Sequence, residues 1–203
     1  MGGFSFDRCY HKHAPLLVGG DRVIYGGSCS SPSVLDADIY VGLCSTMKVL
    51  PDQRPWEKLP PLQILHHIDD MGVPKDAEEF RKLVTWVSDQ LDAGKKIHVG
   101  CIGGHGRTGL FLSALVAVRK VSDDPIAYVR DNYCHRAVES AAQSKFLSTH
   151  YGCPDAAPKK GGFLSNAWSP KPQTWQKESA DVDSGTPLMS PKSIWKPAVR
   201  LKY

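Results

Sequence analysis

The sequence predicts an α/β fold for residues 1–153, with a central, mostly parallel twisted sheet flanked by helices. Two observations support this prediction. Short strand-like runs alternate along the chain with longer stretches of helical periodicity. Residues 110–118 are apolar on all sides, which is typical of a helix buried in the centre of a domain. The alternation favours a parallel sheet, because parallel strands need long crossover connections between them.

Four short β-like runs are predicted as strands: residues 23–25, 38–41, 64–68 and 96–99. Gly26-Gly27, after the first run, is interpreted as a turn signal. Besides the buried helix, three helices are predicted, at residues 74–92, 124–130 and 140–150. Asp124-Pro125 has the capping chemistry expected at the start of the second of these.

The composition changes at Pro154, so we divide the chain into a folded domain of residues 1–153 and a tail of residues 154–203. The tail holds seven of the fifteen prolines, and its eight Lys/Arg against four Asp/Glu leave a charge of 8 − 4 = +4. This composition is typical of a flexible segment. Three of the five tryptophans lie in the tail, at 168, 175 and 195. They either pack on the domain or bind a protein partner that the sequence does not identify.

Charge and hydropathy narrow the choice of partner and compartment. The whole chain carries +4, so residues 1–153 are neutral overall, which argues against nucleic acid as the main ligand. No run of about 18 apolar residues occurs, so no membrane partner is expected. The first residues lack the features of a signal peptide. We therefore expect a cytoplasmic protein whose six cysteines are free thiols.

Cys9, His11 and His13 stand close together in the sequence and resemble half of a metal site. No second cluster of Cys and His residues completes it. We interpret these residues as ordinary loop residues, and we expect no metal and no other cofactor.

The segment from residue 97 to residue 109 carries the strongest chemical signal. A strand leads to Cys101, a glycine-rich loop follows, and the loop enters the N-terminus of the buried helix. Helix N-termini attract anions because their N–H groups lack partners. Glycines at 103, 104 and 106 allow further N–H groups to converge into an anion-binding nest. Arg107 adds a planar guanidinium group that can bind two phosphate oxygens at once.

Cys101 lies at the mouth of this predicted cradle. The positive field that binds phosphate also favours the thiolate of Cys101 over the thiol. A thiolate beside a bound phosphate is placed for in-line attack, which yields a cysteinyl-phosphate. The amides and Arg107 stabilise the charge that develops, and Thr108 can donate its hydroxyl to the sulfur as it leaves.

The pattern Cys-x5-Arg-Thr-Gly, from Cys101 to Gly109, resembles the phosphate loop of the protein tyrosine phosphatase superfamily. The resemblance implies the fold of that superfamily, and it implies a cysteine-dependent phosphatase that acts on phosphorylated proteins. It also implies a set of phosphate-binding residues: Ile102, Gly103, Gly104, His105, Gly106 and Arg107. The short chain has no clear counterpart of the tyrosine-stacking loop of larger members. This favours the compact dual-specificity subclass, which acts on phosphotyrosine and also on phosphoserine and phosphothreonine.

The resemblance further implies a general acid on a loop about thirty residues before the cysteine, because an alkoxide or phenolate leaves poorly without a proton. Asp70 matches best the family's Asp-x-x-x-Pro pattern, which ends here at Pro74. Asp69 remains the alternative.

A third segment, from Arg136 to Phe146, resembles the family's Arg-x-Val-(Gln/Glu)-x-x-x-Gln-x-x-Phe pattern. In relatives a glutamine of this segment orients the water that hydrolyses the cysteinyl-phosphate. The resemblance assigns this role to Gln143, and Glu139, one turn earlier, is a second candidate.

One position departs from the family. Most members have a histidine directly before the cysteine, where this chain has Gly100. His98 can compensate only if its side chain reaches the same place, which the strand's alternation allows. His105, inside the loop, is expected to face solvent, where it either touches the substrate or has no function.

Two other functions use the same residues. RNA 5′-triphosphatases contain the same loop, so a short RNA end is an alternative substrate. If Gly100 in place of the family histidine abolishes catalysis, the domain is instead expected to bind phosphoproteins as an adaptor. In that case the tail carries the function.

Overall fold

The computed structural model describes residues 13–48 and 61–155. Its elements are, in chain order, β1 (Leu16–Leu17), β2 (Val23–Ser28), β3 (Ile39–Gly42), β4 (Leu62–Leu65), α1 (Ala77–Asp92), β5 (Ile97–Cys101), α2 (Gly106–Val118), α3 (Pro125–Asn132) and α4 (Ala141–Tyr151). Apart from residues 154 and 155, the predicted tail lies outside the described residues. Cys9 and His11 lie outside them as well.

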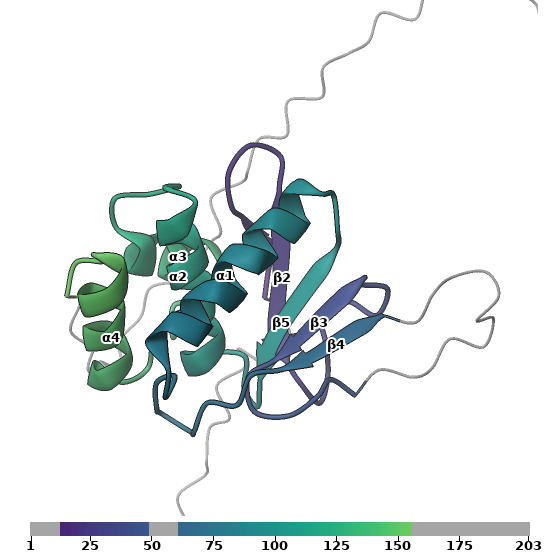
Figure 1. The fold of residues 1–203 in the computed structure, drawn as a ribbon, viewed down its shortest axis with the longest axis horizontal. Coiled ribbons are helices and arrows are strands. Elements are labelled where there is room, and N and C mark those ends of the chain that lie inside the picture. Colours follow the sequence, from purple (N-terminus) through teal and green to yellow (C-terminus); the bar gives the residue numbers. More distant parts are fainter. Residues whose placement is uncertain (1–12, 49–60, 156–203) are drawn as a thin grey trace, which may run out of the picture. The chain divides into compact units, whose positions relative to one another are not determined.

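The described strands form one sheet in the order β1-β2-β5-β3-β4, with β5 at its centre (Figure 1). β5 pairs in parallel with β2 and with β3, β3 pairs in parallel with β4, and only β1 runs antiparallel to its neighbour β2. The prediction of a mostly parallel sheet is therefore confirmed. Ser28 of β2 lies opposite Cys101, so the carboxyl ends of these two strands meet at one edge of the sheet.

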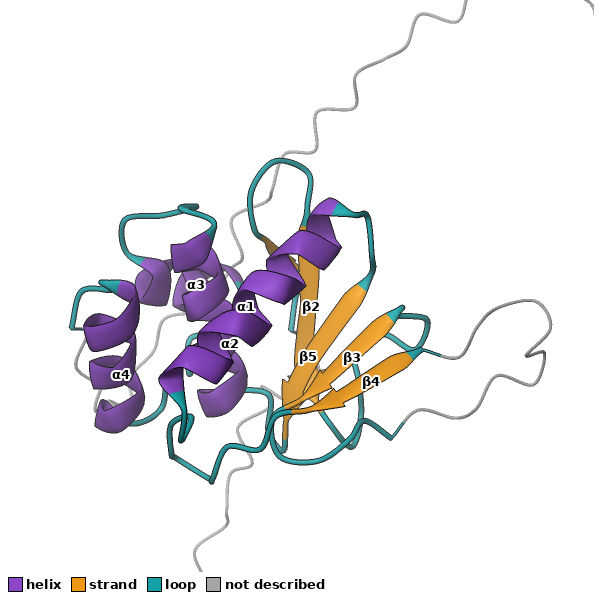
Figure 2. Cartoon of the chain, viewed as in Figure 1, coloured by secondary structure: helices purple, strands orange, loops and turns teal. Residues whose placement is uncertain are grey.

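The helices gather on one side of the sheet, as Figure 2 shows. Alternate residues of the strands point to opposite faces. On β3, Ile39 and Val41 enter the main hydrophobic core, while Tyr40 joins a small second cluster with Ala37 and Met47. On β5, the alternate residues Ile97, Val99 and Cys101 all belong to the main core. Cys101 therefore lies on the face of the sheet that the helices cover.

Helix α2 is the centre of the core. Every residue from Gly106 to Val116 is buried, which confirms the helix predicted from its all-round apolar sequence. The helix begins at Gly106, four residues earlier than its apolar run, because the last residues of the glycine-rich loop already form its first turn. Arg107 and Thr108 are therefore helical residues rather than loop residues.

The remaining helices agree with their sequence signals. Asp76 caps α1 by accepting hydrogen bonds from the N–H groups of Glu78 and Glu79. Asp124 caps α3 with Pro125 in its first turn, as predicted. Ser140 caps α4, so this helix begins one residue later than predicted.

Three strand predictions need correction. Gly26 and Gly27 are not a turn: they are paired residues of β2, held extended by hydrogen bonding to β5. The third strand is residues 62–65 and not 64–68, since its partner β3 ends opposite Leu65. β1 was not predicted, because a strand of two residues is too short to show a period.

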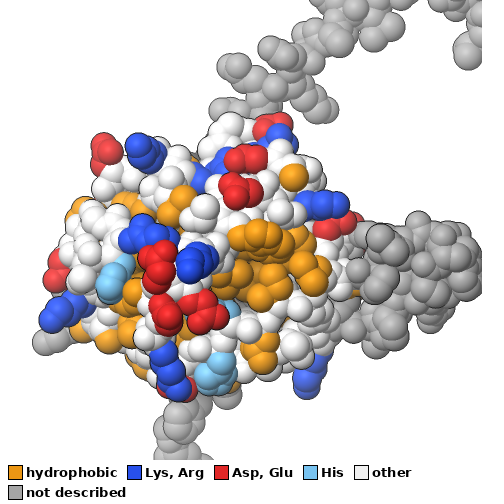
Figure 3. Space-filling view, viewed as in Figure 1, with side chains coloured by type: hydrophobic (Ala, Val, Ile, Leu, Met, Phe, Trp, Pro, Cys, Tyr) orange, Lys and Arg blue, Asp and Glu red, His pale blue; other side chains and the backbone are white. Residues whose placement is uncertain are grey.

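Acidic and basic side chains are interspersed on the face drawn in Figure 3, together with a group of hydrophobic side chains over the strands. On β4, Leu62 and Leu65 are about half exposed. Within the described residues, no helix combines the length and the hydropathy needed to cross a bilayer.

His98 on β5 is fully buried, and burial lowers its pKa to about 4. Its Nε2 accepts a hydrogen bond of 3.1 Å from the N–H of Ser33. The unfolded chain therefore binds a proton on this ring at a pH where the folded chain does not. By linkage, the free energy of unfolding falls as the pH drops from about 6.5 to about 4.

We expect His98→Gln to make the free energy of unfolding less steeply dependent on pH in this window, by up to about one proton. Glutamine retains an acceptor for the Ser33 N–H but does not titrate. The measurement is urea unfolding at a series of pH values, with exposed His150→Gln as the matched control. Equal slopes in the two variants would show that His98 does not carry this linkage.

Candidate active site

Cys101 ends β5 and is 3% exposed. The hydroxyl of Thr108, in the first turn of α2, donates a hydrogen bond of 3.2 Å to its Sγ. The carbonyl of Cys101 accepts a hydrogen bond of 2.7 Å from the N–H of Cys29. The strand and the helix thus hold the sulfur between them, with a hydroxyl donor aimed at it.

The loop between Cys101 and α2 has its shape fixed from behind. Gly104 has a φ of +74°, and a Cβ at this position would lie 2.8 Å from the backbone of Gly27. Only glycine fits both this left-handed conformation and this close approach. The hydroxyl of Tyr133 donates a hydrogen bond of 2.6 Å to the carbonyl of Gly104. The carbonyl is therefore turned towards the core, away from where an anion would bind.

A cavity of about 260 Å³ opens in front of the loop. Its lining residues are Asp70, Met71, Cys101, Ile102, Gly103, His105, Gly106, Arg107, Arg136, Glu139 and Gln143. Five of the six predicted phosphate-binding residues line it, and Gly104 does not. The N-terminus of α2 also faces the cavity, and its N-cap residue His105 makes no side-chain capping bond, so partial positive charge is available there.

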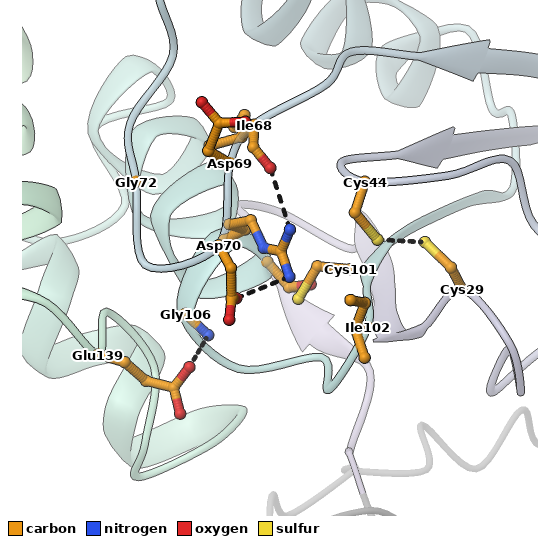
Figure 4. A network of polar contacts seen from close by, with 12 residues as sticks. Cys29, Cys44, Ile68, Asp69, Asp70, Gly72, Cys101, Ile102, Gly106 and Glu139 are labelled. Atoms are coloured by element: carbon orange, nitrogen blue, oxygen red, sulfur yellow. Dashed lines mark hydrogen bonds and ion pairs between the residues drawn. The ribbon is translucent and has the colours of Figure 1, made fainter.

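Arg107 joins the loop to the segment that carries the predicted acid. Its guanidinium group is buried, and it donates hydrogen bonds to the carbonyl of Ile68 at 3.0 Å and to Oδ1 of Asp70 at 2.9 Å (Figure 4). One nitrogen of the guanidinium group thus holds the backbone of the segment from Ile68 to Pro74, which we call the acid loop. Another nitrogen pairs with the carboxylate of Asp70 at the cavity.

The two candidate acids point in different directions. Asp70 lies at the cavity, against Arg107. Asp69 pairs with His67, with Oδ1 3.2 Å from Nε2, and its other oxygen lies 3.9 Å from Lys75. Figure 4 shows Asp69 turned away from Cys101. Of the two residues, only Asp70 lines the cavity and can meet a leaving group there.

Gln143 is fully buried and lines the cavity, but much of its amide is engaged. Its Oε1 accepts hydrogen bonds from the N–H groups of Glu139 and Ser140, which completes the cap of α4. Its Nε2 donates to the carbonyl of Gly72 at 3.2 Å. Gln143 therefore also ties the acid loop to α4, a second role that the sequence did not indicate.

Glu139 contacts the phosphate loop directly. Its Oε2 accepts a hydrogen bond of 2.9 Å from the N–H of Gly106, and its Oε1 accepts one of 3.3 Å from Arg136 (Figure 4 shows the first). The carboxylate thus occupies one amide of the cradle, while Arg136 balances its charge.

His105 does not face solvent, as the sequence analysis expected, but is 3% exposed. Its Nδ1 lies 3.2 Å from the Sγ of Cys134, and its ring packs edge-on against His13. Burial lowers the pKa of His105 to about 4. The loop directs this side chain into the core because Gly104 reverses the backbone immediately before it.

Gly100 has a packing reason. A Cβ there would lie 2.8 Å from the carbonyl oxygen of Gly27 and 2.8 Å from the terminal carbon of Met47. His98 does not fill the position of the family histidine, since its hydrogen bond goes to Ser33 and its ring lies near Tyr40. Within the described part of the chain, the hydroxyl of Thr108 is the side-chain donor to the Cys101 sulfur.

Two other thiols lie close to the end of β5. The Sγ atoms of Cys44 and Cys29 are 3.7 Å apart (Figure 4). The Cys29 thiol also donates a hydrogen bond of 3.1 Å to the carbonyl of Gly100. Burial raises the pKa of Cys29 to about 11. These two cysteines contact each other and not the sulfur of Cys101.

Met71 and Arg136 line the cavity but were not predicted as site residues. Arg136 entered the prediction only as part of the segment from Arg136 to Phe146. Met71 has a φ of +55° directly after Asp70, a conformation that its residue type does not signal. Arg136 belongs to the segment compared with the family, but sequence spacing does not show that its side chain turns towards Glu139.

Comparisons with known proteins agree with this geometry. The family model for Protein-tyrosine phosphatase matches residues 53–147. An uncharacterized protein of Methanocaldococcus jannaschii is 38% identical over 90 residues, which are 44% of this chain and 58% of that protein. A second uncharacterized protein of the same organism is 38% identical over 80 residues, 39% of this chain and 49% of that protein. The chain thus spans about half the length of these curated relatives.

A solved structure shares the fold. The crystal structure of Tk-PTP in its active form matches with a TM-score of 0.54 and 21% identity, over 68% of this chain and 96% of that one. The segment matched by the family model contains the acid loop, the phosphate loop, α2 and most of α4. These elements thus lie within the segment that the Protein-tyrosine phosphatase family model matches, and the fold is the one that Tk-PTP has.

Proposed function

We propose that this protein is a cysteine-dependent phosphatase that hydrolyses phosphate monoesters of proteins through a cysteinyl-phosphate intermediate. The observation that carries the proposal is the convergence of Cys101, Arg107 and Asp70 on one cavity at the N-terminus of α2, with Thr108 hydrogen-bonded to the sulfur of Cys101. Together they supply a nucleophile, a phosphate clamp, a donor to the sulfur and a proton donor, which this reaction requires.

In the first step, phosphate enters between the loop amides and Arg107. Its oxygens replace the carboxylate of Asp70 as partners of the guanidinium group, since both are anions competing for one edge. The thiolate of Cys101 attacks phosphorus in line, and an S–P bond forms as the P–O bond to the leaving group breaks. Asp70, released from Arg107, takes up a proton from solvent and gives it to the leaving oxygen.

In the second step, water attacks the cysteinyl-phosphate and the S–P bond breaks. The hydroxyl of Thr108 stabilises the departing thiolate, and its 3.2 Å contact with Sγ supports this role. Asp70 accepts a proton from the water. Gln143 and Glu139 both line the cavity and remain the candidates for orienting that water.

The rim of the cavity supports phosphotyrosine as the preferred substrate. Ile102 is 64% exposed and Met71 is 49% exposed, and both line the cavity. Two exposed apolar side chains beside a phosphate site suit the flat ring of phosphotyrosine, whereas phosphoserine offers them little apolar surface. We propose that phosphoserine and phosphothreonine are weaker substrates of the same site.

The first test is the metal-free hydrolysis of p-nitrophenyl phosphate as a function of pH. We expect Cys101→Ser to abolish turnover, because it removes the nucleophile. We expect Asp70→Asn to lower kcat by about 10² or more and to flatten the basic limb of the profile, since asparagine has no proton to lose.

Asp69→Asn is the matched control, because Asp69 carries the same charge on the same loop but turns away from the cavity. Its profile should keep the wild-type shape. A basic limb flattened by Asp69→Asn instead would reassign the acid. A wild type that binds vanadate but hydrolyses nothing would replace the enzyme with a phosphoprotein-binding adaptor.

A second prediction follows from the ion pair between Asp70 and Arg107. Asp70→Asn removes an anion that competes with the ligand for the guanidinium group, so we expect vanadate to bind several-fold more tightly to this variant than to wild type. Asp69→Asn should leave the affinity unchanged. Calorimetric titration with vanadate measures both, and weaker binding to Asp70→Asn would contradict the competition.

A third prediction concerns the substrate. Ile102→Ala and Met71→Ala should raise KM for a phosphotyrosine peptide several-fold and change KM for the same peptide with phosphoserine little, because only the aromatic ring reaches these side chains. Equal losses on both peptides would argue against ring recognition. Faster release of phosphate from a 5′-triphosphate RNA end than from either peptide would favour the RNA triphosphatase instead.

A further inference from the structure

Behind the phosphate loop, three potential metal ligands meet from distant parts of the sequence. They are His13 before β1, His105 in the loop itself, and Cys134 after α3. One ligand atom from each residue lies within 4.8 Å of the other two. Cys134 and His105 are buried, at 4% and 3% exposure, and His13 is half-buried. The cluster is therefore enclosed but reachable from the side of His13.

The distances suit one tetrahedral ion. With Zn–N near 2.0 Å and Zn–S near 2.3 Å, a nitrogen and a sulfur on the same zinc stand about 3.6 Å apart. Nδ1 of His105 and Sγ of Cys134 lie 3.2 Å apart. The rings of His13 and His105 have centroids 5.2 Å apart at 86°. Shifts of a few tenths of an ångström for the first pair, and a modest approach of His13, would close the set around a metal.

The state of His13 supplies a second, independent observation. Its Nε2 is buried and has no hydrogen-bond partner among the described residues. Its Nδ1 lies 3.3 Å from the hydroxyl of Tyr133, which also holds the carbonyl of Gly104. A second partner on one ring nitrogen is the usual way in which proteins orient a ligating histidine. The nitrogen left over is the one that a metal would take.

We infer that His13, His105 and Cys134 bind a divalent ion of the zinc type, on the side of the phosphate loop opposite Cys101. Two imidazoles and one thiolate suit a borderline-soft ion better than Mg²⁺ or Ca²⁺, which prefer oxygen. Binding forms one S–metal bond and two N–metal bonds, and the thiol proton of Cys134 leaves to solvent. Described residues would thus fill three of the four positions of a tetrahedral ion.

Such an ion would join three segments: the segment that holds His13, the phosphate loop and the end of α3. It would stabilise the loop without touching the nucleophile. This inference revises the expectation of no metal, and it does not depend on the proposed phosphatase activity.

The test is a titration of the full chain with Co²⁺, whose thiolate complexes show a charge-transfer band and intense tetrahedral d–d bands. The background variant is Cys9→Ser with Cys101→Ser, which removes two thiols outside the proposed site. We expect one equivalent of Co²⁺ to develop both sets of bands and one equivalent of Zn²⁺ to bleach them.

Adding Cys134→Ser should abolish the charge-transfer band, and adding His13→Gln should weaken binding by at least about 100-fold. Cys44→Ser is the matched control, since Cys44 lies against Cys29 and could bind the probe as a thiol pair. It should leave the spectrum unchanged. Zn²⁺ should also raise the Tm of the background variant, and His13→Gln should remove that rise.

Three outcomes would overturn the inference. No band in the background variant would show a hydrogen-bonded packing cluster without a metal. A band lost with Cys44→Ser, but kept with Cys134→Ser, would place the ion at the other thiol pair. An unchanged affinity of His13→Gln for Co²⁺ would show that His13 is not a ligand. This variant keeps the test decisive even if Cys134→Ser does not fold.

Discussion

The candidate site depends on the hydrogen bonds and the ion pair that the buried guanidinium group of Arg107 makes with the acid loop. A buried cation is costly unless charged and polar partners surround it. Here a backbone carbonyl and a carboxylate from the acid loop supply those partners. The same group that would clamp phosphate therefore sets the position of the acid loop when no phosphate is bound. In the proposed reaction, exchange of the Asp70 carboxylate for a phosphate on this guanidinium group would link substrate binding to release of the proton donor.

The phosphate loop is shaped as much by what lies behind it as by its own glycines. Tyr133 holds the carbonyl of Gly104, and His13 packs against the same glycine, 2.8 Å from where its Cβ would be. With one carbonyl turned inwards, the amides of neighbouring residues are free to face the cavity. Residues far from the loop in the sequence thus support the anion site from its protein side, and they include the ligands of the proposed ion.

The absence of a histidine before the nucleophile also follows from packing. β5 is the central strand, and β2 and Met47 approach Gly100 too closely for any side chain. Support of the sulfur passes to Thr108, which reaches it from the first turn of α2. On this chain the sulfur is held by the helix that follows the loop, while the strand before it is packed tightly against its neighbours.

Structural features that depend on residues close together in the sequence could be predicted from the sequence alone. The strand, loop and helix around Cys101 could be predicted because glycine placement and apolar periodicity act within a few residues, and the cap of α3 is local for the same reason. The positions of Asp70 and Asp69 relative to the cavity are set only by the tertiary structure. The two are adjacent and chemically identical, and contact with Arg107, 37 residues away, separates them. The burial of His105, the contact of Gln143 with Gly72 and the meeting of His13 with Cys134 also depend on tertiary contacts. Each depends on where a side chain points after distant segments pack, and packing is a property of the whole core rather than of local spacing.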